Sequence, residues 1–72
     1  MNATAERKTR AEARVKFVYS LIRIHGPLNM KAIEGLLPDW DPIVVTAALA
    51  ELERSGQLQT GMDDGLRYWW IQ

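Results

Sequence analysis

The chain has 72 residues, which allows one small domain with one hydrophobic core, and its 47% of hydrophobic and 25% of charged residues are ordinary for a globular fold. Its formal net charge is zero, and it has no cysteine, which excludes disulfides and thiolate metal sites. The sequence shows no apolar run of bilayer length and no secretory signal, so we expect a cytoplasmic protein without a membrane anchor.

The two parts of the chain carry opposite charge. Residues 1–25 contain six Lys and Arg against two Glu, a net charge of +4, and residues 26–72 contain three against seven acids, a net charge of −4. A basic helical face is usually just solvated, but such a split can also orient a protein against a polyanion. Both interpretations stay open at this point.

The sequence predicts a long helix over residues 4–25. Residues 1–14 form a basic, helical N-terminal extension of the domain. Thr4 can cap its first turn. The pair Gly26-Pro27 ends it, because glycine favours the position after a helix and proline cannot continue one.

The apolar residues of this helix cover an arc that is too wide for one small core. The residues of one side are Val15, Val18, Tyr19 and Ile22, and those of a neighbouring stripe are Phe17, Leu21 and Ile24. Either the helix lies centrally and other elements cover both sides, or the stripe is a contact face between two copies of the chain.

A short helix is predicted over residues 30–37, with Asn29 as its cap and Pro38 beyond its end. Its inward-facing residues are expected to be Ala32, Ile33, Leu36 and Leu37. Leu28, which precedes it, is placed to form a very short strand beside a hairpin.

The next helix is predicted to begin with Asp41 as N-cap and Pro42 as first helical residue, and to end at Ser55-Gly56. Helical spacing turns one set of residues inward and another outward. The inward residues are Val45, Ala48, Leu49 and Leu52, and the outward residues are Val44, Thr46, Ala47, Ala50, Glu51 and Arg54.

The last 16 residues predict a hairpin, with strands at 57–61 and 66–71 around the turn 62–65, where Asp64-Gly65 can supply positive φ angles. In the second strand, Leu66, Tyr68 and Trp70 face one way and Arg67, Trp69 and Ile71 the other. Only one of these faces can pack on the core. The other face would leave Trp69 and Ile71 near solvent, so we expect it to be a candidate contact surface.

Helix, helix and hairpin in this order resemble a winged helix-turn-helix domain of the kind found in small bacterial, archaeal and phage transcription regulators. The resemblance spans about residues 15–71 and rests on segments 25–29, 45–56 and 65–69. It implies one domain over residues 1–72, of the α+β class and mostly α. Three helices are followed by a two-stranded wing, with a possible short strand at Leu28.

In DNA-binding members of this family the second helix of the motif enters the major groove and the wing touches the flanking backbone. The resemblance therefore implies a homodimeric DNA-binding regulator. Its candidate contacts are Arg10, Arg14, Lys16, Lys31, Thr46, Arg54 and Arg67, with Arg7 and Lys8 beside them, and its dimer contacts are Phe17, Leu21 and Ile24. Residues 29–56 have a net charge of −3, which departs from the family's pattern and disfavours insertion into a groove lined by phosphates.

The alternative is a winged helix that binds another protein, as an adaptor or a phage-type inhibitor does. Its contact face would be small, apolar and acidic, with Val44, Ala47, Ala50 and Glu51 and an exposed Trp69. An enzyme is a remote third interpretation. His25 stands at a helix end, and the acidic pairs stand at caps and turns, where backbone roles suffice. We therefore expect no catalytic residue, cofactor or metal.

Overall fold

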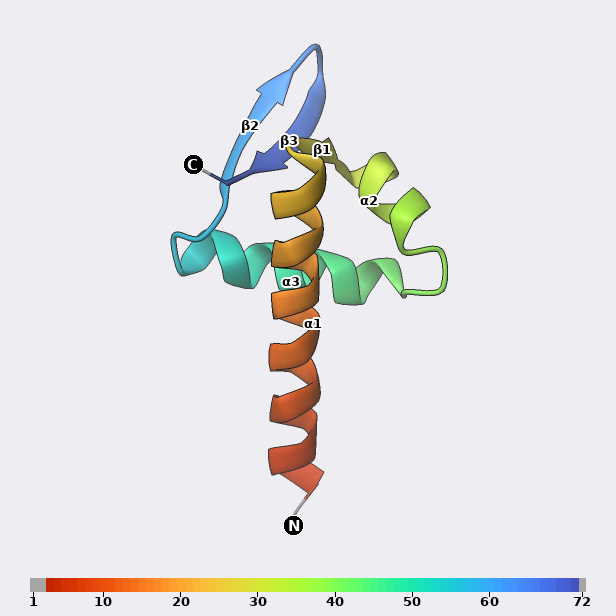
Figure 1. Cartoon of the computed structure of the whole chain (residues 1–72), viewed down its shortest axis with the longest axis vertical. Coiled ribbons are helices and arrows are strands. Elements are labelled where there is room, and N and C mark those ends of the chain that lie inside the picture. Colours follow the sequence, from red (N-terminus) through yellow and green to blue (C-terminus); the bar gives the residue numbers. More distant parts are fainter. Residues whose placement is uncertain (1–2, 72) are drawn as a thin grey trace.

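The computed structural model describes the backbone of residues 3–71 and the side chains of residues 10–71. Its elements are α1 (Ala3–His25), β1 (Leu28–Asn29), α2 (Met30–Leu36), α3 (Pro42–Arg54), β2 (Gln59–Asp63) and β3 (Leu66–Trp70), as Figure 1 shows. The strands form an antiparallel sheet in the order β1-β3-β2. This mostly helical α+β arrangement was predicted, including the strand at Leu28, and is consistent with a winged-helix layout.

Local signals place the helix ends close to where the sequence predicts them. Gly26 has a φ of +80° and its backbone N–H donates to the carbonyl oxygen of Ile22 at 2.8 Å, which closes α1. The helix begins at Ala3, so Thr4 lies inside the first turn instead of before it, a difference within the usual uncertainty of helix ends. The side chain of Thr4 lies outside the described side chains, as do those of Arg7 and Lys8.

Both predicted N-caps are confirmed. Asn29 Oδ1 accepts a hydrogen bond from the backbone N–H of Ala32 at 2.8 Å, and Asp41 Oδ1 accepts one from that of Ile43 at 2.9 Å. Pro42 follows as the first residue of α3, where its missing N–H has no helical partner to lose. These caps fix where α2 and α3 start.

The core lies where α1, α2, α3 and the sheet meet. Its buried residues are Val18, Ile22, Ile33, Leu37, Val45, Ala48, Leu49, Leu52, Leu58 and Trp69. The four residues predicted for the inner face of α3 are all among them. Val15 and Tyr19 of α1 pack against this cluster from its margin.

The prediction for α2 is wrong for Ala32 and Leu36, which are exposed. The helix has seven residues and touches the core along one narrow side. Ile33 and Leu37 occupy that side because they are about 40° apart around the helix axis, whereas Ala32 is rotated from Ile33 by about 100°.

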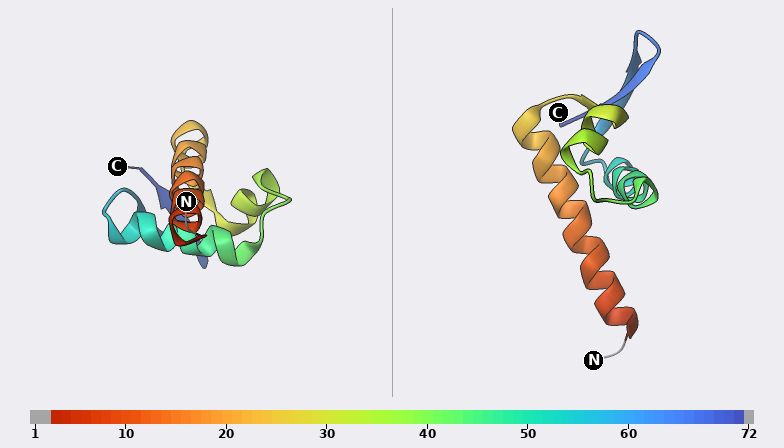
Figure 2. Two further views of the ribbon diagram at one scale, coloured as in Figure 1. Left: turned by 90° about the horizontal axis from the view of Figure 1, so that it is seen from below. Right: turned by 90° about the vertical axis from the view of Figure 1, so that its right-hand side faces the viewer.

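The idea that other elements cover α1 on both sides is also wrong. Residues 28–70 form their elements on one side of α1, and its N-terminal half extends away from them (Figures 1 and 2). Leu21 is half-buried against the core. Phe17 remains 52% exposed beside the ring of Trp40, at a centroid distance of 5.5 Å, and Ile24 is 77% exposed.

The hairpin turn is shorter than predicted. Strand β2 begins at Gln59 and continues through Asp63, which pairs with Leu66, so the loop contains two residues, Asp64 and Gly65. Their φ angles are +52° and +78°, and two successive positive φ angles match the twist of the flanking strands. The two-residue loop shifts the first strand by two residues relative to the prediction.

Trp69 was predicted to be an exposed partner contact, and the structure contradicts this. Its side chain is only 7% exposed, and its Nε1–H donates to Glu53 Oε1 of α3 at 2.7 Å. Strand β3 is the central strand of the sheet, and the face with Trp69 and Ile71 is the one that packs on the core. The opposite face of β3 carries Leu66, Tyr68 and Trp70.

Candidate nucleic-acid interface

The wing, α3 and the N-terminal half of α1 follow one another along one side of the molecule, as the right-hand view of Figure 2 shows. Helix α3 lies in the middle, with the hairpin on one flank and α1 on the other. Its outward residues form a surface that we call the α3 ridge, made of Ile43, Thr46, Ala47, Ala50 and Arg54, all of which are exposed. Three of the predicted contact residues lie on this ridge, namely Thr46, Ala47 and Arg54.

The α3 ridge is mostly small or apolar. Ile43 is 77% exposed at the start of the helix, and Ala47 and Ala50 leave the helix backbone open to close approach. The hydroxyl of Thr46 donates to the carbonyl oxygen of Pro42 at 2.9 Å, so its oxygen remains as an acceptor for an outside group.

Arg54, the cation of the α3 ridge, forms an ion pair with Glu51 one turn earlier on the same helix. Both side chains are largely exposed, at 78% and 47%. Water and salt screen such a pair, so we expect it to contribute about 0.3–0.5 kcal/mol and to open readily when a stronger partner approaches.

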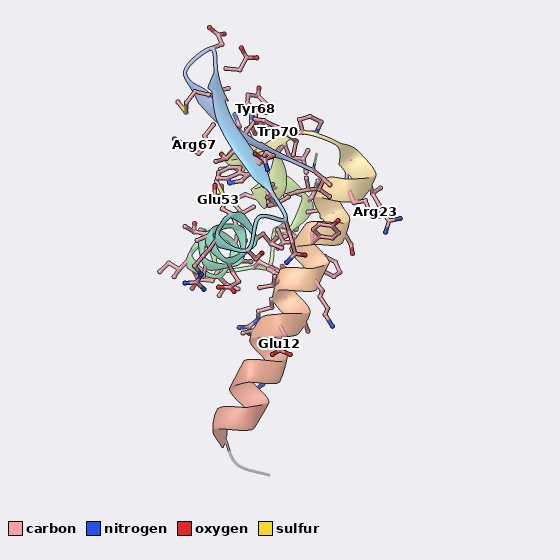
Figure 3. All side chains as sticks on the ribbon, turned by 90° about the vertical axis from the view of Figure 1, so that its left-hand side faces the viewer. Glu12, Arg23, Glu53, Arg67, Tyr68 and Trp70 are labelled. Atoms are coloured by element: carbon pink, nitrogen blue, oxygen red, sulfur yellow. The ribbon has the colours of Figure 1, made fainter. Side chains whose placement is uncertain are left out.

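The wing supplies a cation on the side that faces α3. Arg67 Nη1 donates to Thr60 Oγ1 at 3.2 Å, and Thr60 Oγ1 donates to the carbonyl oxygen of Tyr68 at 2.9 Å. Figure 3 shows Arg67 on the same side of the molecule as Glu53 of α3, with Arg23 on the far side of α1. The tip of the wing is acidic, because Asp63 and Asp64 are both exposed there.

A groove of about 850 Å³ lies between α3 and the middle of α1, residues 11–20. We call it the α1–α3 groove. Its apolar lining includes Val15, Tyr19, Val44, Ala47, Ala48 and Leu52, and its charged lining is Glu12, Arg14, Lys16 and Glu51. Within the described side chains, neither Arg14 nor Lys16 takes part in an ion pair.

The structure brings some predicted residues together and separates others. Arg14 and Lys16, proposed as DNA contacts, share the α1–α3 groove with Val44 and Ala47, proposed as partner contacts. Arg10 lies one turn before Arg14 and is exposed. Lys31 lies in the first turn of α2, and Phe17, Leu21 and Ile24 face another side of α1; none of these lines the groove.

Three features of this face have no clear signal in the sequence. Ile43 is part of the α3 ridge although it follows a proline in the first turn, where an apolar residue could equally pack inward. Glu53 binds Trp69 across 16 residues of sequence, and only the packing of the wing on α3 brings the two together. Tyr19 is placed in the groove by the crossing of α1 and α3.

No protein-family model matches the chain, and no match is found among curated proteins or solved structures. In the described part of the chain, no three His, Asp or Glu side chains gather as potential metal ligands. None of the helices there combines the length and the apolar character that crossing a membrane requires. The geometry and charge of the face just described are therefore what indicate a function.

Proposed function

We propose that this chain is a DNA-binding winged-helix protein, a small transcription regulator that presents the α3 ridge to the major groove. The observation that supports this is the placement of exposed cations on both flanks of an exposed helix. Arg67 lies on the wing side, and Arg14 and Lys16 line the α1–α3 groove on the α1 side.

Phosphate contacts supply most of the affinity of such proteins and fix their position on the duplex, whereas base contacts supply the specificity. The flanking cations suit the two phosphate backbones on either side of a groove. The small side chains of Ala47 and Ala50 let the helix approach the base edges closely, and Thr46 and Arg54 are the ridge residues that can bond to bases.

The acidic residues limit how strong this binding can be. Asp63 and Asp64 repel phosphates at the tip of the wing, and Glu51 competes with DNA for Arg54. With about three phosphate contacts from Arg14, Lys16 and Arg67, a plot of log affinity against log salt should have a slope of about −3.

The test is a titration of mixed-sequence duplex DNA from about 20 to 200 mM salt, with the wild type and single variants. Arg67→Ala and Lys16→Ala should each weaken binding and reduce the salt slope by about one. Arg23→Ala is the matched control, because it removes the same charge from an exposed site on the far side of α1. Absence of binding at the lowest salt, or an equal loss in the control, would contradict the proposal.

A second candidate function is the binding of another protein. It is favoured by the apolar and electrically neutral α3 ridge, on which Ile43 is 77% exposed and Arg54 is paired with Glu51. Salt-insensitive binding of a protein partner, lost in Ile43→Lys and retained in Ile24→Lys, would support it. The two isoleucines have the same exposed fraction and differ in the face on which they lie.

A further inference from the structure

Strand β2 is an edge strand of the sheet (Figure 1). In the described chain its one strand neighbour is β3, and the backbone hydrogen bonds of turns, loops and caps do not reach it. In a hairpin with a two-residue loop, the residues that flank the loop exchange backbone hydrogen bonds, and these are Asp63 and Leu66. This orientation alternates, so the N–H and C=O groups of Thr60 and Met62 point away from β3. Strand β2 therefore offers backbone hydrogen bonds to another extended strand.

The ring of Trp70 lies across this edge strand on the outer face of the wing, which is the side of the sheet away from the core. A Cβ added to Gly61 would come within 3.0 Å of Trp70 Cη2, at the far end of the indole. Trp70 is paired with Gln59, so the ring leans diagonally over the glycine two residues further along β2. The missing side chain of Gly61 thus leaves the room in which the indole reaches the edge strand.

A hollow of about 360 Å³ lies beside this ring. It is lined by Pro27, Gly61, Met62, Asp63, Tyr68 and Trp70. The register places Asp63 on the same face as Tyr68 and Trp70, one diagonal step from Tyr68. Both rings are half-exposed and the carboxylate is exposed. Aromatic faces next to a carboxylate suit an organic cation, because ring and carboxylate both attract positive charge.

The charge along this edge has one sign. Residues 57–65 contain Asp63 and Asp64 and no Lys or Arg. Arg67 belongs to the opposite face of the hairpin, where it donates to Thr60 Oγ1 at 3.2 Å. The α1–α3 groove is different, because two acids and two cations line it and its charge selects no occupant. The edge of the wing is therefore complementary to a basic segment.

We propose that the free edge of β2 binds an extended, basic segment of another protein, which adds a strand to the sheet and places an arginine side chain in the hollow. Strand addition supplies main-chain hydrogen bonds to Thr60 and Met62, and the hollow selects the side chain. A residue opposite Gly61 on the added strand turns its side chain to the outer face. Its guanidinium can stack on Trp70 and form paired hydrogen bonds with Asp63, a geometry that lysine lacks.

This surface is separate from the one proposed to contact DNA, and the inference does not rest on DNA binding. Arg67 and the α3 ridge lie on the other side of the sheet. A second copy of the chain fits the edge less well, because pairing of two β2 edges would gather Asp63 and Asp64 of both copies. A basic segment of a different protein has no such repulsion.

The first test is an NMR titration, without DNA, with the peptide acetyl-Thr-Val-Arg-Val-Thr-amide and with the same peptide carrying citrulline, the neutral isostere of arginine. The arginine peptide should shift the backbone amides of Thr60 and Met62 and the ring signals of Trp70, with a Kd below about 1 mM. The indole N–H of Trp69 should not move, because it is buried and bonded to Glu53. Citrulline should weaken binding at least about tenfold, since the charge is lost.

Two pairs of variants locate the site. Asp63→Asn should weaken the arginine peptide about tenfold and leave the citrulline peptide unchanged, whereas Asp39→Asn, at an exposed acid outside the wing, should change neither. Gly61→Ala should weaken binding because the added methyl group displaces the Trp70 ring. Gly35→Ala adds the same group where it meets open space and should have no effect.

Methylated peptides test the added strand itself, since the amide nitrogens of alternate residues point to opposite edges of a strand. N-methylation of one alternate set should abolish binding, and N-methylation of the other set should retain it. Equal effects of the two sets, unshifted β2 amides, or equal binding of the citrulline peptide would overturn the proposal. So would β2 shifts that grow with protein concentration alone, which would identify a second copy as the occupant. Lys16→Ala should weaken DNA binding and leave peptide binding unchanged, so the two proposals fail separately.

Discussion

Trp69 connects the wing to the helices. Its indole is buried between the wing and the helices, and its Nε1–H is satisfied by the half-buried carboxylate of Glu53 at 2.7 Å. A buried indole N–H needs such an acceptor, and bonds to charged groups are among the stronger ones. This contact ties the position of the wing, and with it Arg67, to α3.

Trp69→Phe should therefore lower the free energy of unfolding by about 2 kcal/mol, through the lost hydrogen bond and the smaller ring. Trp70→Phe is the control at the neighbouring position. Its side chain is half-exposed on the outer face of the wing, so the loss should stay below about 1 kcal/mol. Urea unfolding followed by circular dichroism measures both, and equal losses would contradict the assignment of the buried face.

Among the elements, the hairpin depends most on one backbone conformation. Its two-residue loop requires positive φ at Asp64 and Gly65, a region that asparagine, aspartate and glycine tolerate best. The register set by this loop pairs Thr60 with Trp69, so the two side chains lie on the same face of the sheet. A change of register by one residue would move Trp69 out of the core.

Gly65→Ala should destabilise the domain by about 1 kcal/mol, because a Cβ is strained at a φ of +78° although no atom lies near it. Gly35→Ala offers a comparison within α2. There the added Cβ also meets open space, but the helical backbone accepts it, so the change should stabilise by about 0.5 kcal/mol. Thermal unfolding of the two variants should shift in opposite directions, and shifts of the same sign would contradict the turn geometry.

The molecule consists of a compact body and an extended arm (Figure 1). The arm is the N-terminal half of α1, and the body contains the C-terminal half of α1 and residues 28–71. The C-terminal half of α1 contributes Val18 and Ile22 to the core, and its middle, residues 11–20, borders the α1–α3 groove. The body should therefore fold without the first turns of the arm.

A variant that lacks residues 1–9 should keep its unfolding midpoint to within about 4 °C of that of the full chain, because the core residues that the structure describes all lie beyond residue 9. Scanning calorimetry of both chains checks this, and a variant that no longer unfolds cooperatively would show that the body needs the arm.

The ends of the helices and the inner face of α3 were predictable because their signals are local. Asn29 and Asp41 cap within three residues of themselves, Gly26-Pro27 stops a helix wherever it stands, and helical spacing alone selects the buried side of α3. The candidate cations could be named for the same reason, since charge is a property of each residue.

Only the tertiary structure decided which side of β3 is buried, how much of α1 is covered and which contact residues share a surface. Alternation along a strand is the same for both faces, so it could not select Trp69 over Trp70, and the choice depends on where α1 and α3 lie. Likewise, Arg14 and Ala47 became neighbours because α1 crosses α3. Contacts between residues distant in sequence arise from packing, and packing is set by the whole chain at once.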